Sequence, residues 1–222
     1  MARLPRLALA GQAHWLSQHA HSAGPAFADD SDRHLYLAAL QEAARSEHVR
    51  LHAFALLPQA VHLLATPAQS QGLGRLMQAV GRRYVSAYHR RHGGSGTLWS
   101  GRFRCALVQP GPTLLDVLCL LDGMDAEAGH TSQTHRTTDG HLALLTDPPE
   151  YWALGNTPFD RQARWRDRVA EGLPPATRQQ LLAAAHGGWV IGSATFQQKV
   201  AETMARPVAP RPRGRPAAVR KS

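Results

Sequence analysis

Hydrophobic residues recur along this chain at two different periods, and their alternation predicts an ordered series of strands and helices. Apolar positions two residues apart indicate strands, whereas spacings of three and four indicate helix faces. By this criterion helices are expected over residues 31–47, 73–91 and 113–121, with Asp29, Asp30 and Ser31 as candidate caps of the first. Strands are expected over residues 14–18, 50–57, 61–66 and 103–108.

The order of these elements predicts the fold class. A turn at Pro58-Gln59 separates the second and third strands, which indicates a hairpin. The series strand-helix-strand-strand-helix-strand is typical of an α+β fold, here a ferredoxin-like antiparallel sheet with helices on one face.

The second half of the chain is patterned differently. Residues 130–146 are polar and weakly patterned, which predicts a loop, and helical patterns return at 159–172, 175–185 and 193–205. We therefore expect three parts: a sheet-containing domain at 1–130, a helical C-terminal extension at 131–205, and a basic tail at 206–222 without regular structure.

Charge favours a polyanionic partner. The 222 residues carry a net charge of +9, and arginine supplies nearly all of the basic groups, since Lys199 and Lys221 are the only lysines. Arginine forks match phosphate oxygens and guanine edges well, although a GC-rich genome would also enrich arginine. Removing the six positive charges of the tail leaves about +3 for the rest of the chain, so the tail carries most of the excess.

The sequence also indicates a compartment. Cys105 and Cys119 lack metal-type spacing, which favours a reduced, cytosolic chain. No apolar run approaches the ~20 residues of a membrane span, and the N-terminus does not resemble a signal peptide. We expect a cytoplasmic protein without membrane contact.

One strand resembles a metal-binding motif that has lost a ligand. Two histidines separated by one residue on a strand point to the same face and can hold a divalent ion at a phosphodiester. Here Ala60 occupies the first of these positions and His62 the second. His62 alone is more typical of an ordinary strand histidine.

A series of sequence blocks, in order along the chain, resembles a known family. The blocks are Met1-Ala2-Arg3-Leu4-Pro5-Arg6, Leu51-His52-Ala53-Phe54, Leu76-Met77-Gln78, Gly81-Arg82-Arg83-Tyr84-Val85, Gly96-Thr97-Leu98-Trp99-Ser100-Gly101-Arg102-Phe103, Tyr151-Trp152-Ala153-Leu154-Gly155, Gly188-Trp189-Val190-Ile191-Gly192-Ser193 and Arg211-Pro212-Arg213-Gly214-Arg215-Pro216. They resemble the REP-associated tyrosine transposases, a branch of the HUH single-strand transposases.

The resemblance implies DNA transposition on hairpin-forming, repetitive palindromic DNA. It implies a tyrosine that attacks a phosphodiester and becomes linked to the 5′-phosphate. It also implies two histidines and a third polar residue that hold Mg²⁺ or Mn²⁺. Relatives with a single tyrosine often act as dimers, so a homodimer is a further expectation.

This chain departs from the family at each catalytic position. Leu120 stands where the family has its nucleophilic tyrosine, and Met124, one helical turn later, replaces the third metal ligand. Ala60 replaces the first histidine. Leucine cannot attack phosphorus, and one imidazole is a poor magnesium site because Mg²⁺ prefers oxygen ligands. We therefore expect a catalytically inactive copy that needs no cofactor, with a divalent metal only if activity is retained.

Two rearrangements could preserve activity, and we keep them as alternatives. Tyr84 or Tyr88 could replace the nucleophile, although a packing role is expected for Tyr84. Histidines near the first strand could complete a metal site with His62; they are His14, His19 and His21. A third alternative is a decaying gene product without function.

DNA binding could survive the loss of chemistry. Basic residues on the second helix and the following strand could follow a phosphate backbone, although such residues are often only solvated surface. Alternation predicts two of them on one face of the strand, opposite Phe103. The candidates are Arg82, Arg83, Arg90, Arg91, Arg102 and Arg104.

The tail contains a second candidate DNA contact. Pro212-Arg213-Gly214-Arg215-Pro216 resembles an AT-hook core, in which Arg213 and Arg215 would lie in a narrow A·T minor groove. A solubilising tail with a chance match is the alternative. Taken together, the sequence predicts a hairpin- or single-strand-binding protein of transposase descent, associated with the nucleoid.

Overall fold

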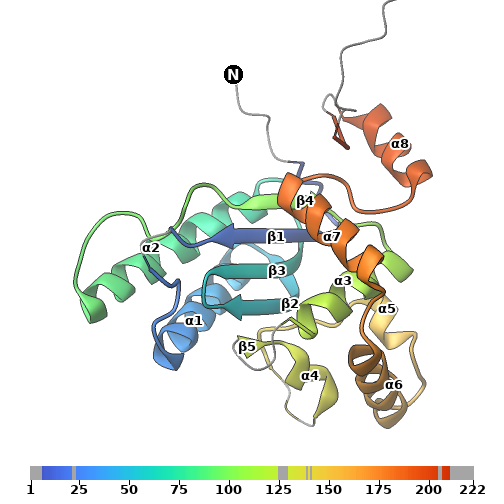
Figure 1. Cartoon of the computed structure of the whole chain (residues 1–222), viewed down its shortest axis with the longest axis horizontal. Helices are drawn as coiled ribbons and strands as arrows, with labels where there is room; N and C mark the ends of the chain where they lie inside the picture. Colours follow the sequence, from blue (N-terminus) through green and yellow to red (C-terminus); the bar gives the residue numbers. More distant parts are fainter. Residues whose placement is uncertain are drawn as a thin grey trace, which may run out of the picture.

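A five-stranded antiparallel sheet organises the computed structural model, which describes residues 7–21, 24–124, 130–138, 140, 142–204 and 207–210 (Figure 1). The strands are β1 (His14–His19), β2 (Val49–Leu57), β3 (Ala60–Pro67), β4 (Arg104–Leu107) and β5 (His130–Thr131). Their order across the sheet is β4-β1-β3-β2-β5.

Helices connect and cover these strands. They are α1 (Asp30–Ser46), α2 (Gly72–His92), α3 (Pro112–Asp122), α4 (Gln133–Thr137), α5 (Pro149–Trp152), α6 (Pro158–Glu171), α7 (Pro175–Gly187) and α8 (Ala194–Thr203). Helix α1 begins where Asp29 accepts a hydrogen bond from the Asp32 backbone N–H at 2.9 Å, so a predicted capping residue is confirmed. None of the helices in the described ranges is long and apolar enough to cross a membrane.

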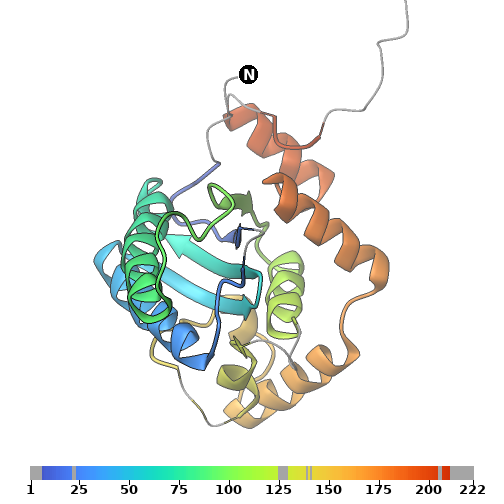
Figure 2. The ribbon, with the colours of Figure 1, turned by 60° about the vertical axis from the view of Figure 1, so that its left-hand side comes forward.

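Two hydrophobic clusters lie on opposite faces of the sheet. One contains Leu16 of β1 and Leu63 of β3 with the apolar sides of α1 and α2. The other contains Trp15 of β1 and Leu64 of β3 with residues of α3, α6 and α7. Figure 2 shows α1 and α2 on one side of the sheet and α3 with α7 on the other. Successive residues of one strand therefore enter different cores.

The predicted α+β class is confirmed. The elements β1-α1-β2-β3-α2-β4 form the antiparallel ferredoxin-like unit, with α1 and α2 on one face as expected. The prediction did not include the covering of the second face by α3, α6 and α7. The apolar side of α3 requires this arrangement, because it buries Leu114, Val117 and Leu121 together.

The prediction of a loop over residues 130–146 is wrong. This segment contains β5, which pairs with β2, and the short helix α4. Three of its polar side chains, Ser132, His135 and Arg136, are buried rather than solvated, which is why the hydrophobic pattern did not reveal the structure of this segment. The guanidinium of Arg136 donates to both Asp122 oxygens, at 2.9 and 3.2 Å, and to Asp147 at 2.8 Å.

The same network reaches the C-terminal helices. The Asp122 carboxylate also accepts hydrogen bonds from Ser132 at 2.5 Å and from the Trp165 indole at 2.9 Å. Arg136 and Asp122 are both fully buried. Residues of the predicted C-terminal extension, such as Trp165, therefore belong to the same core as the sheet. The buried charges of Arg136 and Asp122 are tolerated there because they are paired and hydrogen-bonded.

Several predicted features lie outside the described residues. They are the N-terminal block 1–6, the AT-hook-like segment with Arg213 and Arg215, and the last residues of the stretch matched to the family's tyrosine motif, 125–129. The predictions made for them stay predictions.

Candidate functional site

The degraded histidine motif lies in the middle of the sheet, on the face covered by α3. Register places Arg104 of β4 opposite Ser17 of β1, and Ser17 opposite His62 of β3. The next pair along β1 and β3 is His19 with Ala60. Directly opposed side chains share a face and lie roughly 5 Å apart at Cβ. An imidazole from β1 therefore lies opposite the position where the family's first histidine is missing.

The hydrogen bond that His62 makes decides what its ring can do. The Trp15 indole N–H donates to Nδ1 of His62 at 3.2 Å. Because tryptophan can only donate, Nδ1 must use its lone pair and the neutral ring carries its proton on Nε2. Burial, together with the nearby His19, lowers the pKa of His62 to about 4, so the ring is neutral near pH 7. In this state neither ring nitrogen offers a free lone pair.

The hydrogen bond from Trp15 is incompatible with metal binding by His62. A metal-binding histidine ligates through one nitrogen and donates a hydrogen bond from the other. In His62 the second nitrogen accepts a bond instead, so ligation would require breaking the contact with Trp15. The chemistry of the remaining donor set, one occupied imidazole with Ala60 and Met124, does not fit Mg²⁺ or Mn²⁺.

The two positions to which the resemblance assigns the nucleophile and the third metal ligand are part of the hydrophobic core. Leu120 and Met124 are 7% and 6% exposed, and both belong to the cluster that contains Trp15 and Leu64. They fill space between α3 and the sheet. These side chains provide neither a nucleophile nor a hard metal ligand, and their packing supports a structural role.

The alternative nucleophiles lie on the other side of the sheet. Tyr84 is 1% exposed, and its hydroxyl donates to the backbone oxygen of Ala26 at 2.5 Å. Burial, with Asp32 and other neighbours, raises the pKa of Tyr84 far above its usual value. Tyr88 packs beside it, with ring centroids 6.0 Å apart. Both contribute to the α1/α2 core, so neither faces His62.

The histidines near β1 are distributed over both faces. His14 is completely buried on the face opposite His62, and burial lowers its pKa to about 4. His19 lies 6.1 Å from His62 between ring centroids, and 6.3 Å from His186 at the end of α7. Sequence reasoning had considered His19 but had missed His186, which is distant in the chain, and the anchoring role of Trp15.

The arginines of α2 differ in their partners. Arg83 is paired with Glu42 of α1, and Arg91 is paired with Asp29 and Asp32. Arg82 and Arg90 are exposed, and no hydrogen bond or ion pair joins their guanidinium groups to another described residue. Two of the four candidate groups are therefore already neutralised from within the protein, and two are free for a phosphate.

Arg102 lies before the start of β4, whereas Arg104 is its first residue. Arg104 is the first residue of β4 and faces the His62 side, whereas Phe103 is buried in the opposite core, as the alternation predicts. Arg102 precedes the strand, in a loop that is tied to β1 because the Ser100 N–H donates to the His19 oxygen at 3.0 Å. Both arginines are exposed and lie near the end of β1.

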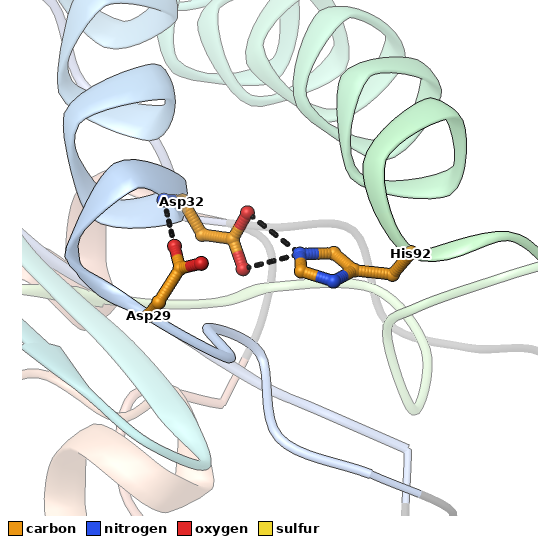
Figure 3. Close-up of side chains that lie close together, drawn as sticks. All are labelled: Asp29, Asp32 and His92. Atoms are coloured by element: carbon orange, nitrogen blue, oxygen red, sulfur yellow. Dashed lines mark hydrogen bonds and ion pairs between the residues drawn. The ribbon is translucent and has the colours of Figure 1, made fainter.

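A second group of potential metal ligands joins α1 to α2. Asp29, Asp32 and His92 place three candidate ligand atoms within 4.8 Å of one another (Figure 3). His92 Nε2 lies 2.9 Å from an oxygen of the buried Asp32, and Arg91 contacts both carboxylates. The hydrogen bonds from Arg91 lower the pKa of Asp29 to about 2. Arg91 and His92 already compensate the two carboxylates, so we interpret the cluster as a structural ion-pair network.

Comparison with solved structures identifies similar folds. The chain is similar to a REP-associated tyrosine transposase bound to a REP hairpin, with a TM-score of 0.53, 11% identity, and coverage of 68% of this chain and 93% of that one. It also matches a candidate transposase from Deinococcus radiodurans R1 with a TM-score of 0.37, 23% identity, and coverage of 49% and 88%.

The similarity to the hairpin-bound structure is a similarity of fold. No protein-family model matches the sequence, and the comparison with curated proteins produces no match. At 11% identity the shared feature is the arrangement of strands and helices.

Proposed function

We propose that this protein binds hairpin or single-stranded DNA with a transposase fold and does not carry out the strand cleavage of the transposase family. The proposal rests on the side chains found at the positions where the resemblance implies catalytic groups. Leu120 and Met124 pack in the core, and Nδ1 of the remaining histidine, His62, accepts a hydrogen bond from the Trp15 indole N–H.

Exposed arginine supports the binding part of the proposal. Arg82, Arg90, Arg102 and Arg104 are exposed and have no ion-pair partner among the described residues, so their charge is available to phosphates. Arg213 and Arg215 of the tail extend the candidate surface, whereas Arg83 and Arg91 would first have to leave their carboxylates. The resemblance also implies a homodimer, and DNA as partner would place the protein in the cytoplasm with the nucleoid.

The experiment compares a hairpin-forming strand with an unstructured strand of equal length and composition over a salt series. A hairpin preference that persists at physiological salt supports structure recognition by the folded domain. Equal, weak affinity for both strands that disappears with salt contradicts the proposal and favours a relic with a basic tail.

A second assay tests the loss of chemistry. The protein is incubated with the hairpin and Mg²⁺ or Mn²⁺, denatured, and separated by gel electrophoresis. We expect no covalent protein–DNA adduct and no shortened strand. An adduct that survives denaturation would contradict the proposal, and a Tyr84→Phe or Tyr88→Phe variant would then identify its origin.

A further inference from the structure

We propose that the former metal face has become a metal-free binding site for a DNA phosphate, formed by Arg104, His19 and His186. This inference rests on the proposed function, because it assigns one contact of the bound DNA. It concerns residues from β1, β4 and α7, on the sheet face that also holds His62.

The fold brings these three side chains to one place. Arg104 lies opposite Ser17, and His19 is two residues further along β1 on the same face. Helix α7 packs against β4 and carries His186 in its last turn, where the His186 ring centroid lies 6.3 Å from that of His19. Figures 1 and 2 both show α7 beside β4. All three side chains are exposed, so a ligand can reach them.

A glycine at the end of α7 allows this helix to lie close to β4. The helix ends at Gly188, whose φ of +66° lies in the left-handed region that glycine adopts without strain. A Cβ at this residue would lie 3.3 Å from the backbone oxygen of Cys105 in β4. Glycine thus allows the end of α7, with His186, to lie directly on the edge strand.

The polar groups that perturb His19 are basic side chains. Burial lowers the pKa of His19, and the neighbouring His186 and Arg104 lower it further, while no carboxylate of the described residues contributes. Elsewhere in the molecule, basic groups that lie this close are compensated: Arg91 and His92 meet Asp29 and Asp32. A group of basic side chains without a carboxylate is suited to bind an anion.

Behind the three exposed groups, His62 has a positioning role. Its ring meets that of His19 edge to face, with centroids 6.1 Å apart, and its own orientation is held by Trp15. The residual histidine of the metal motif therefore supports the ring of His19.

A transition-metal site made of the three imidazoles is the competing interpretation. The bond from Trp15 opposes it, because it occupies the Nδ1 lone pair of His62 and leaves the proton on Nε2. Among the described residues, the group with three ligand atoms within 4.8 Å of one another is Asp29, Asp32 and His92, at another location. The imidazoles of His19, His62 and His186 are not preorganised in this way.

The test uses the full-length protein and a fluorescent hairpin oligonucleotide, titrated by anisotropy from 50 to 200 mM salt with EDTA or with Zn²⁺. The variants are Arg104→Gln, His186→Gln and Arg104→Lys. Arg45→Gln is the matched control, since Arg45 is exposed on α1, which covers the opposite face. Urea denaturation confirms that each variant is folded.

We expect Arg104→Gln to weaken binding about three- to tenfold and to reduce the slope of log K against log salt by about 0.7–0.9, as for one lost phosphate contact. His186→Gln should weaken binding in the same direction, and Arg104→Lys should lie between wild type and Arg104→Gln. EDTA should change none of these affinities.

The possible failures are distinguishable. If the wild-type protein does not bind DNA, the proposed function fails and this site with it. If the wild type binds and both Arg104→Gln and His186→Gln behave like Arg45→Gln, the phosphate site alone is refuted. Binding that requires Zn²⁺ and is abolished by EDTA would overturn the metal-free site in favour of the three-histidine metal site.

Discussion

At the scale of single residues, the polarity of one hydrogen bond decides whether His62 can bind a metal ion. A tryptophan N–H directed at Nδ1 makes His62 a donor on its other nitrogen, the reverse of what a metal requires. Several contacts together hold Arg136 in the core, where its guanidinium meets Asp122, Asp147 and the backbone oxygen of His52. Both cases show a polar side chain whose role depends on its buried partners.

The Arg136 network makes a prediction about stability. Replacing Arg136 by Met leaves Asp122 buried without its counter-charge, so we expect a loss of about 3–5 kcal/mol in the free energy of unfolding. Urea denaturation measures this loss. Arg166→Gln is the control, because Arg166 is exposed and donates only to the backbone oxygen of Thr137, and its effect should stay within about 0.5 kcal/mol. Equal effects of the two substitutions would contradict the role of the network.

A second prediction at this scale concerns pH. His14 is fully buried, its Nε2 accepts the Leu9 N–H at 3.1 Å, and burial lowers its pKa from 6.5 to about 4. Between these values the unfolded chain binds more protons than the folded one, so stability falls as pH falls from 6.5 towards 4. We expect His14 to account for a loss of about 2 kcal/mol between pH 7 and pH 5.

Urea denaturation of wild type and His14→Gln at both pH values measures this contribution. The variant should lose less stability than the wild type between pH 7 and pH 5. An identical pH dependence of the two proteins would show that His14 does not titrate in this way.

At the scale of elements, α2 packs on the sheet and also presents a surface to solvent. Its apolar side, with Leu76 and Val80, belongs to the core shared with α1. Its arginines lie on the remaining surface, and the acidic residues of α1 decide which of them stay free. Glu42 pairs with Arg83, and Asp29 with Asp32 pairs with Arg91, so α1 reduces the positive charge of its neighbour.

The difference between paired and unpaired arginines of α2 predicts that their replacement by glutamine has unequal effects on DNA binding. Arg82→Gln and Arg90→Gln should each weaken DNA binding and lower the salt slope by about 0.7–0.9, since each removes one free phosphate ligand. Arg83→Gln should have a smaller effect, because its guanidinium is already neutralised by Glu42. Salt-dependent anisotropy measures all three. A larger effect of Arg83→Gln than of its neighbour Arg82→Gln would contradict the assignment of Arg82, rather than Arg83, as a phosphate ligand.

At the scale of the whole molecule, the charge is distributed unevenly between the folded body and the tail. The tail holds six basic residues of a chain whose net charge is +9. A basic segment increases affinity for any nucleic acid, whereas recognition of a hairpin requires a shaped surface. The two contributions can therefore be separated by truncation.

Deleting residues 211–222, which leaves the buried Val208 and its backbone hydrogen bond with Val190 in place, should weaken binding to all DNA and flatten its salt dependence, because several phosphate contacts are lost together. The ratio of affinities for hairpin and unstructured strands should change little. Anisotropy titrations of the truncated and full-length proteins measure both quantities. Unchanged affinity and slope would contradict a DNA-binding role of the tail, and a lost hairpin preference would place recognition in the tail.

The sequence by itself determined the order of elements. Hydrophobic periodicity is a local property, so the six elements from β1 to β4 could be predicted within a few residues. The presence of Ala60, Leu120 and Met124 at positions where the resemblance implies two metal ligands and a nucleophile could likewise be read directly, and the loss of chemistry that we infer from them stays a prediction. By contrast, Arg136 looked like part of a polar loop, because its partner Asp122 makes burial possible only once the chain has folded.

Tertiary structure decided which polar groups meet. His186 reaches His19 only through the packing of α7 against β4, and Trp15 reaches His62 only through the register of β1 on β3. The same holds for the arginines of α2, whose ion pairs depend on α1. These interactions join residues distant in the chain, so no local pattern encodes them, and they determine the charge and hydrogen-bonding state on which function depends.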